Sequence, residues 1–186
     1  MLIGAGWTVE VEVTYSIDFE RGSIDLLGWH PGTATLLVIE EKSELVSVEE
    51  TLRRHDAKAR LVARIAEDRF GWRARPVARL LVLPEGTTPR RRVGRHDAVL
   101  RRAYPLRGAD ARSWLAAPTS AQGSLLFVPS PDTNRARGRR GTTARKRIRL
   151  RVVAAVGACV VPARLAGKPD IAAWVRPQGA YHERHS

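Results

Sequence analysis

Three charged side chains on two consecutive predicted strands have the types and spacing needed to bind a cation. Asp25 lies on the first of these strands, and Glu40 and Lys42 lie two residues apart on the second. Residues two apart on a strand share one face of the sheet, so Glu40 and Lys42 point the same way and Glu41 points the opposite way. A pair of carboxylates would suit a hard divalent cation, and a neighbouring lysine can orient a water or offset charge that develops on a phosphate.

The turn between these two strands decides how Asp25 meets Glu40. The intervening segment, HPGT, has turn chemistry and indicates a β-hairpin. A two-residue turn at 32–33 pairs Asp25 with Glu40, whereas a turn at 31–32 pairs Asp25 with Val38. In both registers the charged residues project from one face, where cross-strand neighbours lie about 5 Å apart at Cβ. Two carboxylates that close repel each other unless a cation or a proton lies between them.

Hydrophobic periodicity predicts the order β-β-β-α-β-α-β for the body of the chain. Alternating apolar residues indicate strands, and an S-x-x-E capping box followed by an apolar stripe indicates a long helix. The predicted strands are 7–16, 23–29, 34–42, 77–83 and 124–128, and the predicted helices are 48–69 and 89–103, with a short helical piece at 109–116. A hairpin followed by helical crossovers implies the α/β class, with a mixed sheet and helices on its faces.

Basic charge is concentrated near the end of the chain. The 186 residues carry a net charge of +13, and residues 133–186 account for 13 basic and two acidic side chains. At about 100–200 residues per domain, this length predicts one domain, over 7–131, followed by a basic, flexible extension over 132–186. Such an extension is either a solvated tail or an arm that binds nucleic-acid phosphates.

Composition excludes several other classes of protein. The single cysteine, Cys159, rules out a disulfide framework and a Cys-based zinc site. No run of about 18 apolar residues is present, so no membrane span is expected. The first residues have no basic segment before an apolar stretch, which is not typical of a secretory signal. We therefore expect a soluble, cytoplasmic protein that does not associate with a membrane.

Four motifs occur in order along the chain: ERGSIDLLGW, LLVIEEKSEL, RRHDAK on the predicted long helix, and RLLVLP followed by PRRRVGRH. Asp followed about 15 residues later by E-x-K on the next strand of a hairpin resembles the PD-(D/E)xK nuclease superfamily. The stretch from Trp7 to Pro129, about two thirds of the chain, is similar to actinobacterial domains of this type that often follow an N-terminal helix-turn-helix.

The resemblance implies a restriction-endonuclease-like fold, a mixed β-sheet core flanked by helices, and the activity of a metal-dependent deoxyribonuclease. Asp25 and Glu40 would hold Mg²⁺ or Mn²⁺, and Lys42 would assist the attacking water. Glu20, a few residues upstream, matches an acidic position that often completes such a site as a further metal ligand and catalytic residue.

In such enzymes the helix after E-x-K often contributes a polar residue to the site. Here Glu49, Asp56 and Lys58 are the candidates for that contribution. The next predicted helix begins with four arginines, Arg90, Arg91, Arg92 and Arg95, which are candidates for nucleic-acid binding. A solvated helix start is the alternative, although positive charge there opposes the helix dipole.

The chain departs from the superfamily pattern in three ways. Ile24 stands where the name-giving proline precedes the aspartate. Glu41 occupies a position that is usually apolar because it packs on a helix, so this strand either buries a charge or is exposed on that side. Only residues 1–6 precede the first strand, so we expect an upstream helix-turn-helix module as a partner absent from this chain.

These observations leave hypotheses of different classes open. The first is a Mg²⁺-dependent nuclease that acts on DNA, as a monomer or a homodimer. The second is a catalytically silent nuclease-like domain that serves as a DNA-binding or regulatory module. A third is a basic protein that binds nucleic acid through its tail. Retention of all four residues, Glu20, Asp25, Glu40 and Lys42, favours the enzyme, because a silent domain has no need to keep them.

Overall fold

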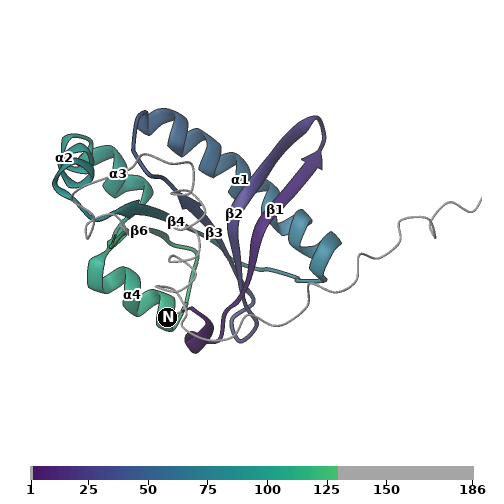
Figure 1. Cartoon of the computed structure of the whole chain (residues 1–186). Coiled ribbons are helices and arrows are strands. Elements are labelled where there is room, and N and C mark those ends of the chain that lie inside the picture. Colours follow the sequence, from purple (N-terminus) through teal and green to yellow (C-terminus); the bar gives the residue numbers. More distant parts are fainter. Residues whose placement is uncertain (1, 130–186) are drawn as a thin grey trace, which may run out of the picture.

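A computed structural model of the chain describes residues 2–129 and contains one six-stranded mixed sheet with helices on both faces (Figure 1). The sheet order is β1-β2-β3-β4-β6-β5. The strands are β1 (Thr8–Ile17), β2 (Glu20–His30), β3 (Thr35–Glu41), β4 (Val77–Pro84), β5 (Leu106–Arg107) and β6 (Gly123–Val128). The helices are α1 (Val48–Phe70), α2 (Thr87–Arg95), α3 (Asp97–Ala103) and α4 (Gly108–Ala116), preceded by a 3₁₀ turn, η1 (Ile3–Ala5). The predicted α/β class is confirmed; the predicted extension over 132–186 lies outside the described residues.

Strand pairing makes the sheet antiparallel on one side and parallel on the other. β1, β2 and β3 form an antiparallel meander, and β3, β4, β6 and β5 pair in parallel. Leu26 pairs with Ile39 and His30 pairs with Thr35, which is the register that brings Asp25 opposite Glu40. The predicted two-residue turn is wrong in length, because residues 31–34 all lie between the paired strands and Ala34 has a φ of +49°.

Helix α1 forms where the capping signature predicts it. The Ser47 hydroxyl accepts a hydrogen bond from the Glu50 amide at 3.2 Å, and Gly71 ends the helix in the left-handed region, at φ 70°. The helix packs on the face of the sheet that carries Leu36 and Val38. Its buried side includes three polar residues, Thr51, His55 and Lys58, of which the last two bear on the candidate site below.

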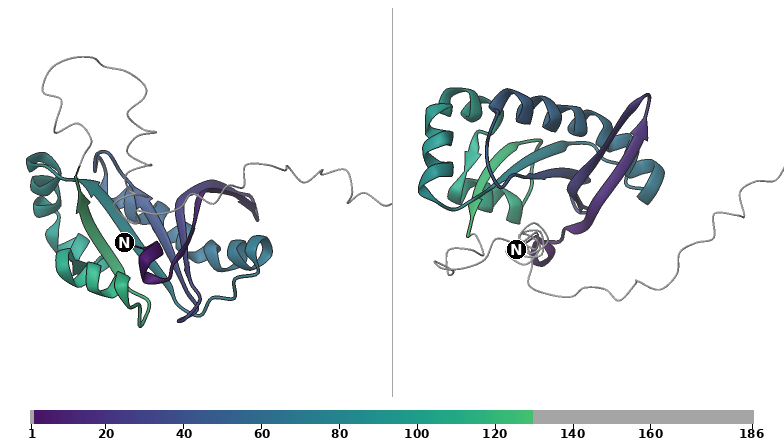
Figure 2. Two further views of the ribbon diagram at one scale, coloured as in Figure 1. Left: turned by 60° about the horizontal axis from the view of Figure 1, so that its bottom comes forward. Right: turned by 45° about the horizontal axis from the view of Figure 1, so that its top comes forward.

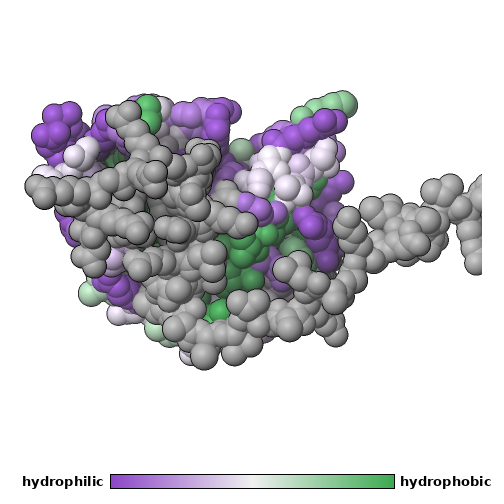
Figure 3. Space-filling model, viewed as in Figure 1, coloured by the Kyte–Doolittle hydropathy of each residue, from purple (hydrophilic) through white to green (hydrophobic). Residues whose placement is uncertain are grey.

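The other face of β3 packs beneath α4 (Figure 2). Leu37 and Ile39 contact the buried side chains of this helix, and the Trp7 indole donates a hydrogen bond to the carbonyl of Leu115 at 2.8 Å. The alternation along β3 therefore sends Glu40 toward α1 and Glu41 toward the opposite face. Figure 3 shows hydrophilic side chains over much of the visible described surface of α1 and α2, with an apolar area below the β1–β2 hairpin.

The segment predicted as one helix over 89–103 is two helices. The backbone leaves helical geometry at His96, which has φ −115° and ψ 26° and separates α2 from α3. The break lets Val93 and Leu100 both enter one apolar cluster at the sheet, and burial of that kind overrides the helical pattern of the sequence. Within residues 2–129 no helix is long and apolar enough to cross a membrane.

Candidate functional site

Two carboxylates and two lysines meet at the end of β3 on the α1 face of the sheet. Glu40 is almost fully buried, with 2% of its surface exposed. One of its oxygens, Oε1, lies 2.6 Å from Nζ of Lys42, and Oε2 contacts Nζ of Lys58. The same Lys58 nitrogen lies 3.9 Å from Oδ1 of Asp25. One ammonium group therefore lies beside both carboxylates.

Asp25 is held in place by the backbone of the neighbouring strand. The paired ladder between β2 and β3 ends at Leu26 and Ile39. Immediately beyond it, Oδ2 of Asp25 accepts a hydrogen bond from the amide of Glu41 at 3.0 Å. The side chain thus continues the connection between the strands and leaves Oδ1 for a cation.

The two carboxyls respond differently to this environment. Burial acts to raise the pKa of Glu40, but hydrogen bonds from Lys42 and Lys58 outweigh it and hold that pKa below its usual value. For Asp25, burial and the negative charge of Glu40 raise the pKa, while the Glu41 amide and the lysines lower it less. Asp25 is therefore the carboxyl whose charge is less fully compensated, and a further cation would stabilise its ionised form.

Glu40 and Lys58 face a cavity of about 450 Å³ between the β1–β2 hairpin and α1. Its rim carries arginines that were not among the sequence candidates. The residues that line it are Tyr15, Glu20, Arg21, Gly22, Ser23, Glu40, Arg53, Arg54, Ala57 and Lys58. Burial, followed by the charges of Glu20 and Glu40, raises the pKa of Tyr15. The RR pair within the helical RRHDAK motif is the one signal in the sequence for the arginines on the rim.

The remaining sequence candidates near this site occupy different positions. Glu20 lines the cavity and its carboxylate pairs with Arg60 at 2.8 Å. Among the three candidates on α1, Lys58 reaches the carboxylates, whereas Glu49 lies exposed at the start of the helix and Asp56 pairs with Arg79 of β4. The structure thus brings together Asp25, Glu40, Lys42 and Lys58, with Glu20 at the rim.

The four candidate arginines of α2 do not line this cavity. Arg90 pairs with Glu85 and lies over the Phe127 ring, 4.5 Å from its centroid. Arg92 pairs with Glu44 at 2.7 Å. Arg91 and Arg95 are exposed. Two of the four side chains are thus committed to partners within the fold.

Glu41, which the sequence left as either a buried charge or an exposed one, is half-buried as a residue. Both of its carboxylate oxygens are inaccessible and have no hydrogen-bond partner among residues 2–129. Burial, followed by the charge of Asp25, raises the pKa of Glu41 to about 7. This carboxyl faces away from Lys42 and Lys58, so neither lysine neutralises it.

His55 is a buried polar residue whose role sequence reasoning missed. Its ring nitrogens lie 2.8 Å from the Tyr104 hydroxyl and 3.1 Å from the Val38 carbonyl oxygen, and burial lowers its pKa to about 4. The neutral ring ties α1 to β3 and α3 one turn of helix before Lys58.

In the described part of the chain, no group of three or more His, Cys, Asp and Glu side chains is arranged to hold a metal ion. A cation at this site would thus rest on the two carboxylates of Asp25 and Glu40, with water completing its shell. Mg²⁺ commonly binds in this way, keeping several waters and using one or two carboxylates.

Comparison with known proteins adds no assignment. No protein-family model matches the chain, and neither a curated protein nor a solved structure is similar to it.

Proposed function

We propose that the cavity at Glu40 is the active site of a Mg²⁺-dependent phosphodiesterase that cleaves DNA, in a domain with the restriction-endonuclease-like fold. The observation that carries the proposal is that Asp25 and Glu40, on two adjacent strands, have carboxylates close enough to lie beside the same ammonium group. The antiparallel hairpin, the E-x-K sequence at the end of β3 and the parallel strand β4 after α1 support the fold assignment.

The donor atoms fit a hard divalent cation. Carboxylate oxygens are the ligands that Mg²⁺ and Mn²⁺ prefer. Burial and the charge of Glu40 raise the pKa of Asp25, and a cation beside this carboxyl would stabilise its ionised form. Asp25 and Glu40 would hold the ion, and Glu20 at the rim would add an outer ligand. When bound, such an ion acidifies a water and offsets negative charge on a phosphate.

The chain's own cationic residues are placed to act on a phosphodiester. Lys42 is 29% exposed at its side chain while it pairs with Glu40, so it can contact solvent and a substrate phosphate without leaving the site. Arg21, Arg53 and Arg54 line the same cavity. Arginine side chains at this rim would bind the phosphates that flank the cleaved bond.

The test is cleavage of DNA by the purified full-length chain with Mg²⁺, Mn²⁺ or Ca²⁺. We expect cleavage with the first two ions, and binding with little turnover with Ca²⁺. Lys42→Ala should keep metal and DNA binding and lose about 10²-fold or more in rate, as for removal of a group that stabilises the transition state. Asp25→Ala should lose metal binding as well. Robust metal-dependent cleavage by the double variant would refute the assignment.

A catalytically silent DNA-binding or regulatory domain is the second candidate. The contact between Lys58 and Glu40 favours it, because a lysine already compensates the carboxylate that a metal would otherwise neutralise. This candidate predicts DNA binding that is unchanged by EDTA and no cleavage by the wild type. It also predicts no cleavage after a helix-turn-helix domain is fused before Met1, a change that would supply any missing DNA affinity.

A further inference from the structure

The tip of the β1–β2 hairpin carries a phenylalanine that is fully exposed to solvent. Among residues 2–129, Phe19 is the most exposed of the large apolar side chains. Figures 1 and 2 show the end of this hairpin projecting beyond the sheet, and Figure 3 shows apolar atoms there. A lone exposed apolar residue is ordinary on a protein surface, but the backbone and the neighbours of Phe19 distinguish it.

The backbone at this tip is unfavourable for the residue that it carries. Asp18 and Phe19 form a two-residue turn between the paired residues Ile17 and Glu20, and their φ values are both positive, 45° and 69°. Such turns favour Asn-Gly or Asp-Gly, because glycine adopts a positive φ easily and a bulky side chain does not. The turn therefore holds a phenyl ring where glycine would fit better, and the ring gains no burial in return.

The residues on both sides of Phe19 are tied to helix α1. The Asp18 carboxylate lies 3.0 Å from Nη1 of Arg64, and the Glu20 carboxylate lies 2.8 Å from Nη2 of Arg60, one turn earlier on the helix. Exposed ion pairs are individually weak, but two of them that flank a two-residue turn restrict how the turn can move. The ring is thus presented to solvent from a tip that is held in place.

The wall of the cavity at Glu40 begins at the residue after Phe19. Residues 20–23 line that cavity from β2. At about 3.4 Å per residue of a strand, Phe19 lies no more than about 20 Å along β2 from Asp25, a length of about six base steps of a DNA strand. DNA that extends from the cavity along β2 therefore reaches the tip of the hairpin.

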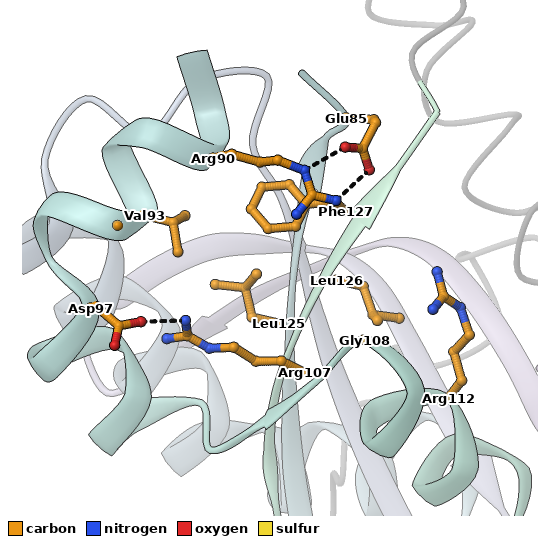
Figure 4. A pocket seen from close by; sticks show the side chains of 11 residues that line it. Glu85, Arg90, Val93, Asp97, Arg107, Gly108, Arg112, Leu125, Leu126 and Phe127 are labelled. Carbon is orange, nitrogen blue, oxygen red and sulfur yellow. Dashed lines mark hydrogen bonds and ion pairs between the residues drawn. The ribbon is translucent and has the colours of Figure 1, made fainter. Parts of the chain in front are cut away.

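A second cavity, of about 440 Å³, lies at the carboxyl ends of β4 and β6 (Figure 4). Two of its arginines are already paired, Arg90 with Glu85 and Arg107 with Asp97. No residue of the β1–β2 hairpin lines it, and it shares no lining residue with the cavity at Glu40. Of the two cavities, the one at Glu40 alone is next to Phe19.

We propose that Phe19 stacks on an exposed base of the DNA at the cavity, so that the domain prefers DNA with an interrupted base stack to continuous duplex. The inference rests on the proposed function for its partner and names the substrate class. An aromatic ring stacks on any base, and its insertion costs least at a gap, a fork or an end, where no stacking between bases has to be broken. Arg21, which is exposed and lines the cavity, is placed for a neighbouring phosphate.

Binding of the full-length chain to two DNAs in EDTA tests the inference without cleavage. The probes are a continuous duplex and the same duplex with a one-nucleotide gap, and fluorescence anisotropy gives the ratio of their dissociation constants. Attraction by charge alone is nearly the same for both and cancels in the ratio. We expect a preference of about fivefold or more for the gapped duplex, the effect of one stacked base. Equal binding of both DNAs, or binding of neither, would overturn the inference, whereas cleavage with Mg²⁺ decides the proposed function separately.

Matched variants assign the preference to the ring. Phe19→Gly should abolish the preference for the gapped duplex without lowering the Tm, because glycine readily adopts the positive φ of this position. Phe19→Trp should retain the preference, since its ring also stacks. Val46→Ser removes another exposed apolar side chain, before α1 and outside the cavity, and as the control should leave the preference unchanged. A preference that persists in Phe19→Gly, or that falls equally in Val46→Ser, would overturn the role of Phe19.

Discussion

Asp25 accepts a hydrogen bond from the backbone amide of Glu41 at 3.0 Å. This bond joins β2 to β3, the two strands of the candidate site. The charge of Asp25 also interacts with two other carboxyls, Glu40 on the α1 face of the sheet and Glu41 on the opposite face. Burial and then the charge of Glu40 raise the pKa of Asp25, and burial and then the charge of Asp25 raise the pKa of Glu41. The lysines compensate the α1 face alone, so the opposite face carries an uncompensated carboxyl.

The pH dependence of stability should report Glu41. Its folded pKa is raised from 4.5 to about 7, so the folded state binds this proton more tightly than the unfolded state does. The stabilisation is fully present below pH 4.5 and is lost as the pH rises through 7. Glu41→Gln should remove that loss and, at pH 8, unfold at higher denaturant concentration than the wild type. A gain of about 1–2 kcal/mol is expected after allowance for partial exposure.

Glu44→Gln is the control for Glu41, because it removes a more exposed carboxylate three residues away that pairs with Arg92. Its stability should follow the wild-type dependence on pH from 4.5 to 8, the range over which Glu41 titrates. If the stability of Glu41→Gln depended on pH in the same way as that of the wild type, the Glu41 carboxyl would not be a destabilising charge in the folded state.

His55 should produce the opposite slope over nearly the same pH range, between about 4 and 6.5. Burial lowers its pKa from 6.5 to about 4, so the unfolded state binds the proton more tightly. Stability is therefore full above pH 6.5 and falls toward pH 4, by roughly 3 kcal/mol from this residue. His55→Gln keeps hydrogen-bonding groups near Tyr104 and Val38 without the titration. The free energy of unfolding, measured with denaturant at several pH values, should fall less steeply from pH 6.5 to pH 4 in the variant than in the wild type. An unchanged pH dependence would contradict the prediction.

Much of the fold could be predicted because its signals are local. The alternation in β1, the capping box at Ser47 and the apolar run of β4 each specify an element without reference to the rest of the chain. The division between α2 and α3 could not be predicted, because it follows from where Val93 and Leu100 both find an apolar cluster. Burial of that kind depends on tertiary packing, which the helical periodicity of a sequence does not reveal.

The site residues on β2 and β3 could be predicted from the sequence, whereas the contribution of α1 could be predicted only in part. Strand alternation and hairpin register place Asp25 and Glu40 on one face, since both are properties of neighbouring residues. The sequence offers three candidates on the helix. That Lys58 reaches the carboxylates, whereas Glu49 and Asp56 do not, depends on how α1 is rotated against the sheet, and the apolar face of the helix determines that rotation.

If Glu20 serves the proposed metal site, its substitution should change the Mg²⁺ requirement for cleavage, and substitution of a similar carboxylate nearby should not. Glu20 and Asp18 both extend from the β1–β2 hairpin region and pair with α1 arginines, Arg60 and Arg64, but only Glu20 lines the cavity at Glu40. Glu20→Gln should raise the Mg²⁺ concentration needed for half-maximal cleavage several-fold. Asp18→Asn should not, and both should alter stability by less than about 1 kcal/mol, as for exposed ion pairs. If the two variants required the same Mg²⁺ concentration, Glu20 would not be a ligand of the proposed metal site.

Replacing Lys58 with methionine should make the stability of the fold depend on Mg²⁺. The ammonium group of Lys58 lies beside Asp25 and Glu40, and methionine keeps the apolar stem while removing the charge. Breaking a buried ion pair costs about 3–5 kcal/mol; because Lys42 stays bound to Glu40, we expect a loss near the lower end of that range. A divalent cation can then occupy the vacated position and stabilise the folded state by mass action, by about 1.4 kcal/mol at ten times its Kd.

Lys42→Met is the matched control for this prediction, since it removes the other lysine of Glu40 and leaves Lys58 in place. Thermal unfolding at constant ionic strength, with Mg²⁺ replaced by Na⁺ in the reference, separates specific binding from salt screening. We expect Mg²⁺ to raise the Tm of Lys58→Met more than that of Lys42→Met. Equal shifts in the two variants would mean that the position of Lys58 is not a cation site, and the proposed arrangement of Asp25 and Glu40 around a metal would fail with it.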